Sequence, residues 1–304
     1  MPTKSRRSAP VQTRDLSKHF GPIRAVDGLT LSLRRGEVFG LLGPNGAGKT
    51  TTLRLLMGFL RPTAGALHVL GGDPFDTRVR ARIGYVGAEA RFNPRHTGAE
   101  WLQFCADLRG GGHLKSPKGK TDELVERLEI DPSRPIGQLS TGNKHKISIA
   151  AAFAHSPELL VLDEPTAGLD PLLQRTFREL VSESIASGAT VVLSSHILPE
   201  VEQLADRVGL IRRGKLASIS DIDDLRAHAR QRFDFRFTKR PSITALRKIA
   251  GVVDAQELDG VVRVTLEGSA APLLRAAARV GVERVTTHEV DLDEIFYGMY
   301  EDES

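Results

Sequence analysis

The stretch V-F-G-L-L-G-P-N-G-A-G-K-T, residues 38–50, decides the fold. Its first five residues, Val38 to Leu42, are apolar apart from one glycine, which is the pattern of a short buried strand. A run with helical character follows from Thr51 to Phe59. A strand, a glycine-rich loop and a helix in this order are the context that a phosphate-binding loop requires. We therefore expect an α/β fold with a phosphate site at this loop.

The loop itself carries the residue types that hold phosphate groups. Gly43, Gly46 and Gly48 let backbone N–H groups close around phosphate oxygens, and the N-terminus of the following helix favours an anion. Lys49 can supply positive charge to the β- and γ-phosphates, and Thr50 can offer its hydroxyl to Mg²⁺. The alternative, a chance glycine turn, does not suit the flanking strand and helix. We expect the nucleotide to be bound by Gly43, Pro44, Asn45, Gly46, Ala47, Gly48, Lys49, Thr50 and Thr51.

A second candidate site follows a run of four apolar residues, Leu159 to Leu162. This run predicts a buried strand that delivers Asp163 to its carboxyl end, where ligands bind in open α/β sheets. Asp163 then suits Mg²⁺ coordination, and Glu164 can accept a proton from an attacking water. A helix-capping Asp-Glu pair is the alternative, which the phosphate loop earlier in the chain makes the weaker interpretation.

Together with three further motifs, these sites resemble those of the ABC ATPases. L-S-T-G-N, Leu139 to Asn143, resembles the signature motif of that family, usually L-S-G-G-Q, and Asp163 and Glu164 correspond to its Walker B pair. A-G-L-D, Ala167 to Asp170, resembles the D-loop. His196 resembles the switch histidine, and Phe20 lies where the family places an aromatic ring that stacks on adenine. Alone, such a histidine is more often structural and such a phenylalanine more often part of the core.

The resemblance implies how the site works. Glu164, His196 and Lys49 would be the catalytic residues, and ATP and Mg²⁺ the ligands. Ser140 and Gly142, which we expect to open a helix at Asn143, would bind the γ-phosphate from the opposite subunit of a homodimer. Two nucleotides would then lie between two chains with two-fold symmetry.

One departure from the family pattern concerns the Q-loop. The family places Gln two residues after the strand that is I-G-Y-V here, Ile83 to Val86, but this chain has Ala88 at that position. The next residue, Glu89, is either a replacement ligand of Mg²⁺ or a solvated loop residue, and the sequence does not decide between them.

The chain divides into parts of different character. We expect a disordered basic tail over residues 1–10, an ABC ATP-binding domain over 11–217 and an accessory α+β domain over 218–304. The fold class is thus an α/β P-loop NTPase core with antiparallel β and helical subdomains. The helical subdomain spans about residues 90–157, and Thr97 with Glu100 forms a capping box at its first helix. The last domain follows a β-α-β-β-α-β order plus a terminal helix, which is the ferredoxin-like plan.

The remaining features bear on partners and location. No apolar run approaches the about 20 residues that span a bilayer, so a separate membrane permease would form any transport pathway. The single cysteine, Cys105, fits a reducing compartment. The net charge of +4 permits contact with lipid headgroups or nucleic acid but requires neither. We expect a peripheral location on the cytoplasmic face of the bacterial plasma membrane, bound through the permease.

The subfamily follows from two more stretches. L-S-T-G-N-K-H-K, residues 139–146, and D-L-D-E-I-F-Y, residues 291–297, resemble the ATPases of type 2 ABC exporters that remove antibiotics and other hydrophobic compounds. One alternative is a soluble ABC ATPase acting on nucleic acid or ribosomes. It is disfavoured by the single motif set and by the lack of long coiled coils or zinc-binding cysteines, so we expect no nucleic acid partner. The other alternative is an importer ATPase, which the C-terminal domain disfavours.

Overall fold

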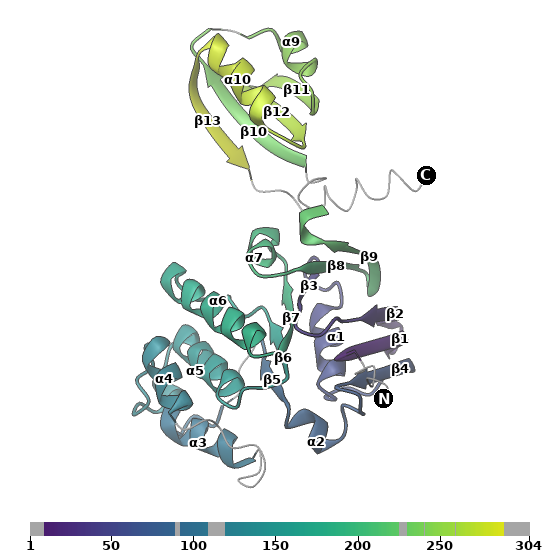
Figure 1. Cartoon of the computed structure of the whole chain (residues 1–304), viewed down its shortest axis with the longest axis vertical. Helices are drawn as coiled ribbons and strands as arrows, with labels where there is room; N and C mark the ends of the chain where they lie inside the picture. Colours follow the sequence, from purple (N-terminus) through teal and green to yellow (C-terminus); the bar gives the residue numbers. More distant parts are fainter. Residues whose placement is uncertain are drawn as a thin grey trace, which may run out of the picture. The chain divides into compact units, whose positions relative to one another are not determined.

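The computed structural model describes residues 9–88, 92–108, 119–224, 230–239, 241–258 and 260–288. The chain forms two compact units, Met1–Ile219 and Ser220–Ser304 (Figure 1). The first unit carries both candidate sites, and the second has its own sheet and core. The predicted tail is described only from residue 9, and the predicted terminal helix lies outside the described residues.

A six-stranded sheet forms the centre of the first unit, in the order β5-β6-β7-β3-β8-β9. The pairs from β5 to β8 are parallel, and every residue of β3, β6 and β7 is buried. Such burial explains the continuous apolar runs seen in the sequence. The strands are β3 (Val38–Leu42), β5 (Ile83–Val86), β6 (Leu159–Asp163), β7 (Thr190–Ser195), β8 (Arg207–Arg212) and β9 (Lys215–Asp221).

A second, antiparallel sheet has the order β2-β1-β4. Its strands are β1 (Val11–Phe20), β2 (Ile23–Ser32) and β4 (Ala64–Val69). Its apolar face shares one core cluster with helix α1 (Lys49–Leu56) and with strand β3. Packing against this cluster fixes α1 between the two sheets, and with it the loop that precedes the helix. The antiparallel subdomain expected from the sequence is therefore present.

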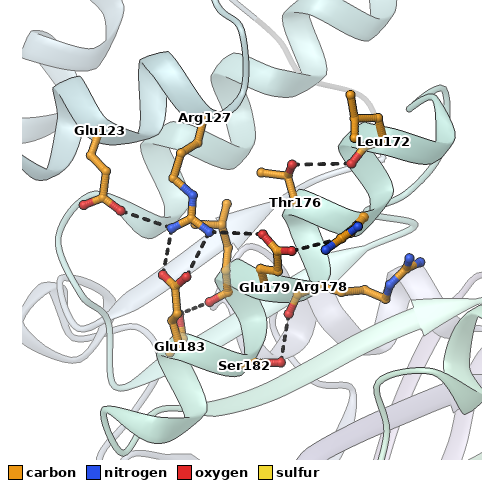
Figure 2. A network of polar contacts seen from close by, with 11 residues as sticks. Glu123, Arg127, Leu172, Thr176, Arg178, Glu179, Ser182 and Glu183 are labelled. Atoms are coloured by element: carbon orange, nitrogen blue, oxygen red, sulfur yellow. Dashed lines mark hydrogen bonds and ion pairs between the residues drawn. The ribbon is translucent and has the colours of Figure 1, made fainter.

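The helical subdomain consists mainly of α3 (Gly98–Leu108), α4 (Lys120–Arg127) and α5 (Thr141–Phe153) (Figure 1). The predicted capping box is confirmed: Thr97 N–H donates to Glu100 Oε2 at 2.8 Å, and Glu100 N–H donates to Thr97 Oγ1 at 3.2 Å. Arg127 joins α4 to α6 (Pro171–Ala186) through an ion-pair network (Figure 2). The shorter helices are α2 (Thr77–Arg80), the 3₁₀ turn Ile136–Gln138 and α7 (Leu198–Glu202).

The second unit follows the predicted β-α-β-β-α-β order, with a sheet ordered β11-β12-β10-β13 and all three strand pairs antiparallel. This is the arrangement of the ferredoxin-like plan. Phe233 and Phe235 of β10 belong to its core cluster. The elements are β10 (Arg230–Phe237), α9 (Ile243–Arg247), β11 (Val252–Leu258), β12 (Val261–Glu267), α10 (Ala271–Val280) and β13 (Val282–His288).

Within the described residues, none of the helices is both long and apolar enough to cross a bilayer.

Candidate active site

The phosphate loop connects the carboxyl end of β3 to the N-terminus of α1, as the sequence predicts. Gly48 has φ 112°, a conformation that L-residues with a side chain rarely adopt. A Cβ atom there would also collide with the carbonyl oxygen of Ala25. Glycine at position 48 is therefore required by both backbone conformation and space. The loop can approach a bound anion closely because no side chain at Gly46 or Gly48 intervenes.

Lys49 lies almost fully buried at the start of α1. Its ammonium group donates hydrogen bonds to the carbonyl oxygens of Gly43 at 2.6 Å and Pro44 at 3.2 Å. It also lies 3.5 Å from Glu164 Oε1. Two carbonyl oxygens of the phosphate loop thus hold the Lys49 ammonium group. This group lies on the side of the loop that faces Glu164, the residue after strand β6.

Asp163 ends β6 beside Thr50. The Thr50 hydroxyl donates to Asp163 Oδ1 at 3.1 Å, and the Ser194 hydroxyl of β7 donates to the same oxygen at 2.7 Å. The second carboxylate oxygen, Oδ2, is buried and has no hydrogen-bond partner in the described part of the chain. A buried polar atom of this kind normally has a partner, so Oδ2 is open to a ligand.

These residues fit Mg²⁺. This ion is usually held by one or two carboxylates together with substrate phosphates and water, rather than by a cage of protein side chains. Asp163 and Thr50 supply a carboxylate and a hydroxyl at one point. Among the described residues there is no group of three or more His, Cys, Asp or Glu side chains that could hold a metal ion alone. The donor set matches a site completed by nucleotide phosphates.

Glu164 follows Asp163 in a left-handed backbone conformation, with φ 49°. A non-glycine residue in this region costs about 1–3 kcal/mol and is common at functional sites. The Glu164 N–H donates to Ser194 Oγ at 3.1 Å. Its carboxylate Oε2 lies 3.0 Å from His196 Nδ1, so the imidazole donates this hydrogen bond. The carboxylate is therefore held between Lys49 on one oxygen and His196 on the other.

The signature motif starts a helix, with a difference from the prediction. Helix α5 begins at Thr141, two residues before the expected start, because Ser140 is its N-cap. The Ser140 hydroxyl oxygen accepts from Asn143 N–H at 3.3 Å, which leaves the hydroxyl proton free to donate. Within the described residues, no hydrogen bond joins Ser140 or Gly142 to the phosphate loop of the same chain.

Phe20 and Glu89 were also predicted to belong to the site, and only Phe20 is among the described residues. Phe20 ends β1 with 47% of its surface exposed, so it is not part of the core. The Lys18 ammonium lies 5.0 Å from the centre of its ring, and stacking on adenine stays a prediction. Glu89 lies outside the described residues, so both interpretations of it remain open, whereas Ala88 is described and exposed.

The structure therefore brings together Lys49, Thr50, Asp163, Glu164 and His196, although they come from three separate segments of the chain. Sequence reasoning did not single out Ser194, which contacts both acidic residues. Its signal was available: Ser194 lies at the carboxyl end of a second apolar strand, and neighbouring parallel strands end at the same edge. The sequence also assigned no role to His145, although this buried side chain contacts Pro165, the residue after Glu164.

Comparison with known proteins agrees with this geometry. The family model described as "ABC transporter" matches residues 26–167. A bacitracin transport ATP-binding protein of Bacillus licheniformis is 34% identical, covering 94% of this chain and 95% of that protein. A daunorubicin resistance ATP-binding protein of Streptomyces coeruleorubidus is also 34% identical, covering 92% of each chain.

Solved structures show the same fold. The ATP-binding subunit of an ABC transporter, 28% identical, superposes with a TM-score of 0.65 and covers 71% of this chain and 91% of that one. An ATP-binding cassette solved as a dimer after hydrolysis, with ADP and phosphate bound, is 23% identical with a TM-score of 0.64, covering 70% of this chain and 98% of that one. The residues matched by the family model, 26–167, include the phosphate loop and the pair Asp163–Glu164.

Proposed function

Because this chain belongs to the ABC transporter family as an ATP-binding and ATP-hydrolysing subunit, we propose that it is the motor of an exporter. It would drive efflux of a hydrophobic compound or drug through a separate permease, at the cytoplasmic face of the membrane. The similarity to bacitracin and daunorubicin proteins along almost the whole chain supports this proposal over an importer or a soluble nucleic-acid-dependent ATPase. The observation that carries the ATPase chemistry is Glu164, held between Lys49 and His196 beside Asp163.

The protein's own groups account for binding of the nucleotide. The N–H groups of the phosphate loop and the N-terminus of α1 favour the phosphate anion. Lys49, whose ammonium group contacts the carbonyls of Gly43 and Pro44 and the Glu164 carboxylate, would turn its charge to the β- and γ-phosphates. Thr50 and Asp163 would hold Mg²⁺, which when bound supplies positive charge that offsets the phosphate oxygens.

Glu164 has the position and chemistry of a general base. Its carboxylate can accept a proton from a water that attacks the γ-phosphate. Ser194 fixes the backbone of Glu164, and His196 fixes one carboxylate oxygen. The base is therefore oriented by two residues of the neighbouring strand and loop before any substrate binds.

The second half of each site would come from another copy of the chain. The Ser140 hydroxyl and the N-terminal amides of α5 form a phosphate-binding end with no described bond to the phosphate loop of its own chain. A two-fold dimer would place this end over the nucleotide of the partner and complete two sites at once. The dimeric form of the similar cassette supports this arrangement.

An aromatic groove offers a place for the permease. The groove has a volume of about 590 Å³ and lies where the end of α1, β5 and α3 meet. Phe59 packs edge-on against Tyr85 and Phe92 against Trp101, with centroids 5.3 Å and 5.1 Å apart. Exposed apolar grooves of this kind mark protein interaction sites. We propose that a segment of the permease docks in this groove.

For the C-terminal unit we propose a separate role, in contacts between the two subunits of the dimer or in regulation.

The test is to purify the chain together with its membrane partner and to measure ATP hydrolysis with and without candidate drugs. The proposal predicts co-purification with a permease and stimulation by a transported compound. A matched variant, Tyr85→Ala, removes one groove aromatic without touching Lys49 or Glu164. It should weaken co-purification while the isolated subunit keeps its nucleotide affinity. Stimulation by nucleic acid or ribosomes, with no permease bound, would support the rival instead.

A further inference from the structure

His145 makes a buried contact that the chemistry described above does not use. The side chain lies on α5, two residues beyond the signature motif L-S-T-G-N, and is only 6% exposed. Its Nε2 atom lies 2.7 Å from the carbonyl oxygen of Pro165. Pro165 directly follows Glu164, so this contact joins the signature helix to the segment that carries the general base.

The direction of the hydrogen bond follows from its partners. A carbonyl oxygen only accepts, so the imidazole must donate through Nε2. Burial lowers the pKa of His145, although the bond to Pro165 opposes this effect. The ring is therefore neutral near pH 7, with its single proton on Nε2. A neutral ring in this tautomer donates a hydrogen bond to the carbonyl oxygen of Pro165, which is a buried residue.

A second contact joins the same two segments. A Cβ atom on Gly142 would lie 3.1 Å from the carbonyl oxygen of Gly168, within the D-loop. Gly142 and His145 are three residues apart and so lie on one face of the helix. The start of α5 thus lies against the segment Glu164–Gly168 at two points. Gly142 lies beside Gly168, and His145 lies beside Pro165.

The segment between these contacts is tightly folded. Glu164 has a left-handed conformation, the Ala167 N–H donates to the Glu164 carbonyl oxygen at 3.2 Å, and Asp170 caps α6 immediately afterwards. A shift of the Pro165 carbonyl would therefore change the backbone of Glu164, because only one peptide unit separates them. The position of the general base depends on where α5 holds Pro165.

We propose that His145 is a positioning residue that transmits the placement of the signature helix to Glu164 of the same chain. The inference rests on the proposed function, in which the N-terminus of α5 binds the nucleotide held by the partner subunit. Each chain would then link two sites: α5 contacts the partner's nucleotide, and His145 passes that contact to the base that acts on the chain's own nucleotide. Hydrolysis in one site thereby depends on occupancy of the other.

The experiment compares His145→Leu with His145→Gln in the full-length chain. Leu fills the space without a donor, whereas the amide of Gln can donate to Pro165. We expect His145→Leu to lower kcat about tenfold while ATP affinity and ATP-induced dimerisation, measured by sedimentation, stay within twofold of wild type. His145→Gln should recover most of the rate. Lys144→Gln, in the same turn but without this contact, is the matched control and should behave as wild type.

Three results would overturn the inference: an unchanged kcat in His145→Leu, no recovery in a folded His145→Gln, or loss of dimerisation in step with loss of rate. The last would mean that His145 serves only the integrity of α5. If the variants do not fold, the imidazole ¹⁵N spectrum of the wild type decides, because a proton on Nδ1 alone is incompatible with the proposed bond. Failure of the proposed function is distinguishable, since the wild type would then show no ATP hydrolysis dependent on Lys49.

Discussion

Arg127 of α4 and Glu183 of α6 form a bidentate ion pair (Figure 2). The Arg127 Nη1 and Nη2 atoms each donate to one oxygen of the Glu183 carboxylate at 2.9 Å. Arg127 also donates to Glu123 at 3.1 Å and lies 3.8 Å from Glu179. One arginine thus joins three carboxylates, two of them on a helix of the core and one on the helical subdomain. Bidentate pairs within a network contribute more than isolated surface pairs.

The first prediction concerns this pair. Arg127→Met should lower the free energy of unfolding by about 1 kcal/mol, because Glu183 loses the guanidinium that binds it and Glu179 is left with Arg175. A double-mutant cycle with Glu183→Gln should show coupling of similar size. A second cycle with Glu123→Gln is the control, and it should show a smaller coupling because Arg127 makes a single hydrogen bond to Glu123.

The pH dependence of the coupling has a definite sign. Hydrogen bonding to Arg127 lowers the pKa of Glu183 below its usual 4.5. A lowered carboxyl pKa gives stability that is fully present above the unfolded pKa and is lost as the pH falls through the folded pKa. The coupling should therefore be constant between pH 7 and pH 5 and decline below about pH 4.5. Coupling that grows on acidification would contradict the assignment.

A second prediction concerns the C-terminal unit. Arg263 donates two bonds of 2.8 Å to Asp234, and His288 Nε2 lies 2.8 Å from the same carboxylate. The hydrogen bond from Arg263, mainly, lowers the pKa of Asp234 from 3.8 to about 2. A shift of this size corresponds to roughly 2 kcal/mol, and solvent screening reduces it to about 1 kcal/mol.

The stabilisation from Asp234 should be full above about pH 4 and lost as the pH falls toward 2, because the folded state binds this proton later than the unfolded state. Asp234→Asn should thus lower the unfolding midpoint of this unit at pH 7 by more than at pH 3, as followed by calorimetry. Asp254→Asn provides a comparison, because the half-exposed side chain of Asp254 contacts Arg247 instead. Equal effects of Asp234→Asn at both pH values would refute the lowered pKa.

A third prediction concerns Ser194, which touches both acidic residues of the site. Ser194→Ala removes the donor to Asp163 and the acceptor of the Glu164 N–H. We expect a decrease in kcat of about tenfold, equivalent to about 1.4 kcal/mol in the barrier, because the base loses one of its supports. Ser195→Ala, whose hydroxyl donates to Glu200 instead, should change the rate much less. A wild-type rate in Ser194→Ala would show that His196 suffices to place Glu164.

The order of apolar residues and glycines within single segments was enough to predict the buried strands and the phosphate loop. Val38–Leu42 and Leu159–Leu162 are apolar without interruption because both faces of their strands are buried, and Gly48 is required by its own backbone conformation. The start of α5 was predicted at Asn143 but lies at Thr141, because the Ser140 side chain caps the helix directly before that residue.

Contacts between distant segments could not be read in the same way. Ser194 and Asp163 are 31 residues apart, and they meet because β6 and β7 pair in a register that aligns these two residues. His145 and Pro165 meet because α5 packs against the loop after β6, and no motif spacing encodes that packing. A motif identifies residue types in one segment, whereas register and packing decide which segments meet.

The fourth prediction tests the general base. Glu164→Gln keeps the size of the side chain and its contact with His196 but removes the proton acceptor. ATP hydrolysis should fall by about 10²- to 10⁴-fold, while ATP binding persists and the ATP-bound dimer accumulates. Glu126→Gln, an exposed residue of α4, should leave the rate unchanged. Hydrolysis at the wild-type rate in Glu164→Gln would exclude Glu164 as the base.

The last prediction asks which chain completes the site. Mixed dimers are purified through separate tags, one chain carrying Lys49→Ala and the other Ser140→Arg. If Ser140 acts across the dimer, one site combines both lesions and the other is intact, so up to half of the wild-type activity should return. The control pairs a wild-type chain with one that carries both substitutions, which damages each site once and should stay inactive.

If Ser140 instead completed the site of its own chain, the two outcomes would exchange. The first pair would be inactive, because each chain would carry a lesion in its own site, and the control would be active through its intact chain. The same two substitutions, carried on different chains or on one chain, therefore give opposite results under the two arrangements. The absence of any described hydrogen bond between Ser140 and the phosphate loop within one chain favours recovery in the first pair.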